Sequence, residues 1–107
     1  MSQVEFKLSI GLTTKAGDLL DPDASLAAVS SLLQTAGVDG FSAIPGVGVW
    51  RGTQERCFTV TWIQDAPRGP ALALARTLAA QIASALEQEC VLAQCHEVQF
   101  EFVQSGR

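Results

Sequence analysis

The sequence predicts one α+β domain whose elements follow the order strand–helix–strand–strand–helix–strand. Three observations lead to this prediction. Apolar and polar residues alternate near the start of the chain, and two later stretches repeat apolar residues every three or four positions. A short turn also separates two strand-like stretches in the middle. The 107 residues fit a single domain spanning 1–107 that buries its core without disulfides or metal.

The first strand is expected at about residues 4–12, where every second residue is apolar. A helix is then expected at about residues 22–36. Asp21 can cap its free N–H groups, and Pro22 suits the first helical position. Gly37 provides the stop signal.

The second and third strands are expected at about residues 40–51 and 55–63, joined by a short turn at 52–54. So short a connection predicts that the two strands pair as a hairpin. Pro45 lies inside the second strand and cannot donate a ladder hydrogen bond, which predicts an edge position or a bulge.

A second loop-to-helix signal covers residues 65–70, and the helical stripe that follows runs to about Gln88. The last strand is expected at 90–103, with a bulge or bend near Cys95. The order βαββαβ closes into a four-stranded antiparallel sheet with both helices on one face. This arrangement is the ferredoxin-like fold.

Residue parity predicts which side chains face the helices. In the first, third and fourth strands, the even-numbered apolar residues are expected to lie beneath them, Val98 and Phe100 included. The odd-numbered side chains form a polar face: Glu5, Lys7, Ser9, Gly11, Thr13, Cys57, Thr59, Thr61, Glu97, Gln99 and Glu101. This face is either simply hydrated, or it mates with a second copy or lines a shallow cleft.

A candidate ligand-binding set lies on and beside this face: Trp50, Arg51, Arg56, Thr59 and Thr61. Tryptophan and arginine together can stack on a planar group and hold an anion, which favours a small anionic or nucleotide-like ligand. The alternative is that Trp50 covers the edge of the sheet or packs in a dimer contact.

The charge and composition restrict the partners. The net charge of −4 argues against binding long nucleic acids, and no apolar run is long enough to span a membrane. The N-terminus does not read as a signal peptide, so we expect a cytoplasmic protein with three free thiols. With 48% hydrophobic and only 17% charged residues, part of the surface is expected to be covered in a homo-oligomer or by another protein partner.

No catalytic or metal-binding signature stands out, and no cofactor is expected. Cys90, Cys95 and His96 lack a second ligand pair, and neighbouring strand residues point to opposite faces. His96 is able to act as a base but has no visible companion nucleophile. Glu87 and Glu89 are expected to be solvated near a helix end.

Two short segments, Gly-Val-Trp-Arg at 48–51 and Gln-Glu-Cys-Val-Leu at 88–92, resemble a family of small uncharacterised bacterial proteins. That family has serine where this chain has Cys90. The resemblance covers the C-terminal part of the chain. It implies a ferredoxin-like fold and no known activity, and it also fits a phage-borne member.

Three functional hypotheses follow. The leading one is a non-enzymatic binding or oligomerising module that holds a small anionic or nucleotide-like ligand, or a protein partner. The second is a small enzyme of the dimeric α+β-barrel type, in which His96 or a carboxylate acts in a cleft between protomers. The third is a phage-borne protein that sequesters a host factor or a signalling nucleotide.

Overall fold

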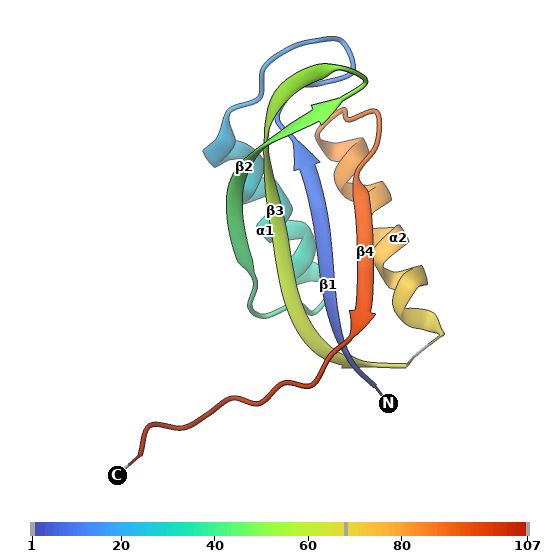
Figure 1. Ribbon diagram of the computed structural model, residues 1–107. Coiled ribbons are helices and arrows are strands. Elements are labelled where there is room, and N and C mark those ends of the chain that lie inside the picture. The colour runs from blue at the N-terminus through green and yellow to red at the C-terminus, as the bar shows by residue number, and fades with distance from the viewer. Residues whose placement is uncertain (1, 68, 107) are drawn as a thin grey trace.

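The computed structural model describes residues 2–67 and 69–106, which form an antiparallel sheet covered on one face by two helices (Figure 1). The elements in chain order are β1 (Ser2–Gly11), α1 (Pro22–Thr35), β2 (Ser42–Trp50), β3 (Thr53–Ala66), α2 (Pro70–Ala85) and β4 (Leu92–Glu97). The strand order across the sheet is β2-β3-β1-β4. This topology confirms the predicted ferredoxin-like α+β fold.

The core lies between the sheet and the two helices, as the alternation in β1 predicted. Phe6, Leu8 and Ile10 are completely buried. Phe6 stacks on Trp62, its direct partner on β3, with ring centroids 5.0 Å apart. β1 pairs with β3 on one side and β4 on the other, so its apolar side lies at the centre of the domain.

Both helices begin with proline and bury one stripe against the sheet. At the start of α1, Asp21 Oδ2 accepts a 2.8 Å hydrogen bond from the backbone N–H of Ala24, which satisfies one free donor of the first turn. Gly37 follows with φ +88°, a conformation that favours glycine, and ends the helix as predicted. None of the helices in the described residues is long and apolar enough to cross a membrane.

The hairpin of β2 and β3 closes through a two-residue turn. Arg51 and Gly52 have φ values of +50° and +79°, the left-handed pair that matches the twist of antiparallel strands. β3 is longer than predicted and runs to Ala66. β2 is an edge strand, which confirms the position inferred from Pro45.

The prediction for the last strand was wrong in length and parity. β4 covers only Leu92–Glu97, and its last ladder partner on β1 is Val4. One further backbone hydrogen bond, from the N–H of Val98 to the oxygen of Gln3, follows the end of the strand. His96 lies opposite Glu5 and therefore faces away from the helices, whereas Cys95 packs against the core.

Residues 98–106 consequently do not form the rest of a core strand. Val98 and Phe100 are only partly buried, and Phe102 is 77% exposed, although all three were expected beneath the helices. The segment instead runs away from the sheet as an extended tail (Figure 1). The alternation in 98–102 therefore belongs to this tail rather than to the sheet.

Candidate functional site

The sheet face turned away from the helices carries the polar side chains and is here called the open face. Residues directly opposite each other in the ladders share a face. The register therefore assigns to the open face Glu5, Lys7, Ser9, Gly11, Ser42, Ile44, Gly46, Gly48, Trp50, Glu55, Cys57, Thr59, Thr61, Leu92, Gln94 and His96. The two ends of this face differ in their chemistry.

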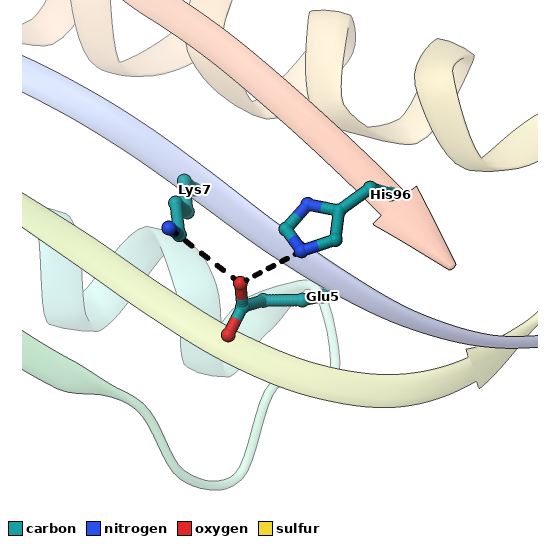
Figure 2. A network of polar contacts seen from close by, with 3 residues as sticks. All are labelled: Glu5, Lys7 and His96. Carbon is teal, nitrogen blue, oxygen red and sulfur yellow. Dashed lines mark ion pairs between the residues drawn. The ribbon is translucent and has the colours of Figure 1, made fainter. Parts of the chain in front are cut away.

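One end carries an ion-pair network centred on Glu5. Its Oε1 atom lies 3.1 Å from His96 Nε2 and 3.6 Å from Lys7 Nζ (Figure 2). His96 lies on the neighbouring strand β4, and Lys7 lies two residues further along β1 itself. The carboxylate is thus already balanced by its neighbours, and the network ties β4 to the centre of the sheet.

The other end exposes backbone, because three of its positions are glycines. Gly11 lies on β1, and Gly46 and Gly48 lie on the edge strand β2. The Sγ atom of Cys57 would be 3.7 and 3.8 Å from β-carbons built at Gly46 and Gly48. A planar ligand can therefore approach the strands closely at this end.

Two side-chain oxygen acceptors converge over Gly11. A β-carbon at Gly11 would lie 2.8 Å from Glu55 Oε1 and 3.0 Å from Gln88 Oε1. Gln88 is 93% buried and donates its Nε2 to the backbone oxygen of Thr13 at 2.9 Å, so its amide is fixed and Oε1 is the atom directed at Gly11. Among the described residues, no hydrogen bond or ion pair engages the Glu55 carboxylate.

The next residue, Glu89, positions an aromatic ring beside these acceptors. Trp50 Nε1 donates a 3.3 Å hydrogen bond to Glu89 Oε2, and Arg51 forms a 3.1 Å ion pair with Glu89 Oε1. The Arg51 guanidinium also lies 5.4 Å from the centre of the Trp50 ring. Because Gln88 and Glu89 are consecutive, Glu55, Gln88, Glu89, Trp50 and Gly11 form one group, here called the acceptor cluster.

The structure separates the five residues of the predicted ligand-binding set. Trp50 and Arg51 lie together as expected. Thr59 shares the open face, with its hydroxyl 3.4 Å from that of Ser9. Thr61 lies opposite Lys7, towards the other end of the face, and Arg56 lies opposite Val47 on the helix side. The binding roles of these five residues stay predictions.

Sequence reasoning placed Gly11 on the polar face but not in the ligand-binding set, missed Glu55 and Gln88 as site residues, and expected Glu89 to be solvated. One available signal was Gly11 itself, since a glycine inside a strand often marks a close approach of another group. The contacts of Glu55 and Gln88 with that position depend on strand pairing and on the loop after α2, which no local pattern indicates.

Comparison with known proteins identifies structures of the same fold. No family model matches the chain, and no curated protein matches it. A phage SAM lyase in the apo state superimposes with a TM-score of 0.76 at 13% identity, covering 94% of this chain and 92% of the other. A phage SAM lyase in complex with S-methyl-5'-thioadenosine has a TM-score of 0.69 at 15% identity, covering 90% and 81%.

This comparison corrects the leading functional hypothesis. The non-enzymatic module is contradicted, because the structures that share the fold over nearly the whole chain are lyases. The enzyme alternative fits these findings better. The resemblance to small bacterial proteins is supported in the fold that it implies. At 13–15% identity, the likeness to the SAM lyases establishes the ferredoxin-like fold of this chain.

Proposed function

We propose that this protein is an enzyme that binds S-adenosylmethionine (SAM) at the acceptor cluster and cleaves it to S-methyl-5'-thioadenosine. The observation that carries the proposal is the Glu55 carboxylate, held over Gly11 beside the fixed Gln88 oxygen and without an ion pair to any described residue. The shared fold with SAM lyases supports it, since one of those structures holds S-methyl-5'-thioadenosine.

The acceptor cluster suits the adenosine part of the ligand. A carboxylate has two oxygens and accepts hydrogen bonds from both ribose hydroxyls, as acidic residues do in dinucleotide sites. The half-exposed Trp50 ring offers a stacking surface for adenine, with its orientation fixed by Glu89. The Gln88 oxygen accepts from an amino or hydroxyl group of the ligand.

The cluster also suits the positive charges of the substrate. SAM carries a sulfonium and an ammonium group, and this chain has a net charge of −4. Glu55 brings a carboxylate without an ion pair among the described residues to the glycine-rich end of the open face, whereas Glu5 at the other end is in contact with Lys7 and His96. Attraction between opposite charges therefore favours the acceptor cluster as the site.

The proposed reaction breaks the bond between the sulfonium sulfur and the γ-carbon of the methionine part. The bonding electron pair stays on sulfur, which gives neutral S-methyl-5'-thioadenosine. The γ-carbon is either bonded by the substrate's own carboxylate oxygen, with no proton transfer, or joined to the β-carbon by a double bond as the β-carbon loses a proton to a carboxylate. In both routes the protein binds the substrate in the reactive conformation.

Incubation of the purified protein with SAM tests the proposal directly. Chromatography with mass detection should show S-methyl-5'-thioadenosine, and the second product, a lactone or an unsaturated amino acid, identifies the route. Titration calorimetry with S-methyl-5'-thioadenosine should give a heat of binding. No conversion of SAM together with no binding of the thioadenosine would contradict the proposal.

The matched variants are Glu55→Gln and Glu5→Gln, which make the same chemical change at the two ends of the open face. Glu55→Gln should weaken the binding of S-methyl-5'-thioadenosine at least about tenfold, equivalent to about 1.4 kcal/mol. Glu5→Gln should leave the affinity for this ligand unchanged. Equal binding by Glu55→Gln and the unmodified protein would place the ligand elsewhere.

A further inference from the structure

The exposed apolar side chains of this protein gather on two segments. Nine large apolar side chains are exposed in the described part of the chain, and six of them belong to the edge strand β2 or to the C-terminal tail. These six are Ile44, Val47, Val49, Trp50, Phe102 and Val103. Such a concentration is a mark of an interaction surface.

The outer edge of β2 has little protection against another chain. β2 is the first strand in the sheet order, so its outer backbone groups have no neighbour within the sheet. Its nine residues include no charged side chain, and Pro45 is its only residue of a type that blocks pairing. Val47 and Val49 are 62% and 72% exposed. An edge of this kind readily accepts an added strand.

The tail is held at its base and then leaves the domain. The Gln3 side chain donates to the backbone oxygen of Phe100 at 3.3 Å and accepts from its N–H at 3.1 Å, which copies the two bonds of a strand neighbour. Beyond Phe100 the chain runs away from the sheet (Figure 1), although Phe102 still borders a cavity formed with the loop at 37–42 and with β3. Residues 101–106 include the exposed Phe102 and Val103 and are free to pair elsewhere.

Residues 101–106 are too few to cover β2 of their own chain. β2 begins at Ser42, which is level with Lys7 in the sheet. Lys7 lies four residues along β1 from the Gln3 anchor, and β2 lies two strands away from β1. That path measures about 13 Å along the strands and about 10 Å across them. Residues 101–106 span at most about 20 Å, so they reach only the start of β2 and not Val47 or Val49.

We infer that residues 101–106 of one copy add to the outer edge of β2 in a second copy, as a fifth strand. Each copy has a net charge of −4 and repels the other, so close contact is favoured where charge is absent. β2 carries no charge, and residues 101–106 carry only that of Glu101. The contact joins the tail of one copy to the β2 edge of the other. Each copy therefore still has one free surface to which a further copy can add in the same head-to-tail manner.

The test is a complementation experiment read by size exclusion with light scattering, and it is independent of the proposed function. The full chain should have a mass that is a multiple of 11.3 kDa. A chain that ends at Phe100 and the double variant Val47→Lys, Val49→Lys should each be monomeric. Mixed together, they should form a heterodimer, since one supplies an intact β2 and the other an intact tail.

Leu72→Lys is the matched control, because Leu72 is 40% exposed but lies on α2, outside both segments. This variant should keep the mass of the full chain. A full chain that is monomeric, or variants that remain associated, would overturn the inference. Two monomeric variants that do not combine on mixing would also overturn it, because association would then use a different pairing. Circular dichroism melts establish that each variant is folded.

Discussion

Glu55 holds its carboxylate directly over the backbone of Gly11, so that a β-carbon there would lie 2.8 and 2.9 Å from its two oxygens. Real β-carbons essentially never approach other atoms this closely. The absence of a side chain at Gly11 therefore allows Glu55 to occupy this position beside Gln88. A local requirement for glycine is thus linked to the site proposed to bind ligand.

Gly11→Ala is expected to weaken binding of S-methyl-5'-thioadenosine by about tenfold, or about 1.4 kcal/mol. The added methyl group displaces the Glu55 carboxylate. Because the fixed Gln88 oxygen would also lie only 3.0 Å from the new carbon, the melting temperature should fall as well. Calorimetric titration and thermal melts check the two parts. Gly40→Ala, with no atom within 4 Å of the new carbon, is the control.

Asp21→Ala should lower the free energy of unfolding by about 1 kcal/mol, because it removes the acceptor for the Ala24 N–H at the start of α1. Denaturant unfolding measures the change. Asp21→Asn keeps a side-chain oxygen at this position and should retain most of the stability. If the alanine and asparagine variants were equally unstable, the capping bond would not be the cause.

Glu5→Gln should change the free energy of unfolding by less than about 1 kcal/mol, since Lys7 and His96 are both substantially exposed partners. The difference from the unmodified protein should shrink as salt is added, because salt screens exposed charges. Urea unfolding at low and high ionic strength checks this. A large loss that salt does not alter would show that the network is structurally essential.

Cys57 should be protected from alkylation when S-methyl-5'-thioadenosine is bound, because its Sγ lies beside Gly46 and Gly48 on the open face. Labelling by iodoacetamide, followed by peptide mass spectrometry, measures the rate at each cysteine. Cys95 packs against the core on the helix side, so its rate should not respond to the ligand. Equal rates at Cys57 with and without ligand would argue against binding over these glycines.

The sequence was sufficient to predict the fold where one pattern repeats within one element. The alternation in β1, the Asp21-Pro22 helix start and the Gly37 stop each act over a few residues, and the structure confirms all three. The predicted length of the last strand was wrong because the apolar alternation continues into the tail. β4 is defined by its pairing with β1, which lies far away in the chain, so no local pattern marks where it ends.

The site was less predictable for the same reason. Trp50 and Arg51 are adjacent in sequence, and their proximity was foreseen. Glu55 and Gln88 meet over Gly11 only because the hairpin, the central strand and the loop after α2 come together. The pair of Glu5 and His96 likewise arises from the register of β1 and β4.

The central place of β1 in the sheet has a consequence for synthesis on the ribosome. This strand precedes both of its neighbours in the chain, which begin only at Thr53 and Leu92. The apolar side of β1, with Phe6, Leu8 and Ile10, therefore remains uncovered while most of the chain is being made. Pairing between segments so far apart in sequence is slow, and it leaves unfinished chains with exposed apolar surface that is prone to aggregation.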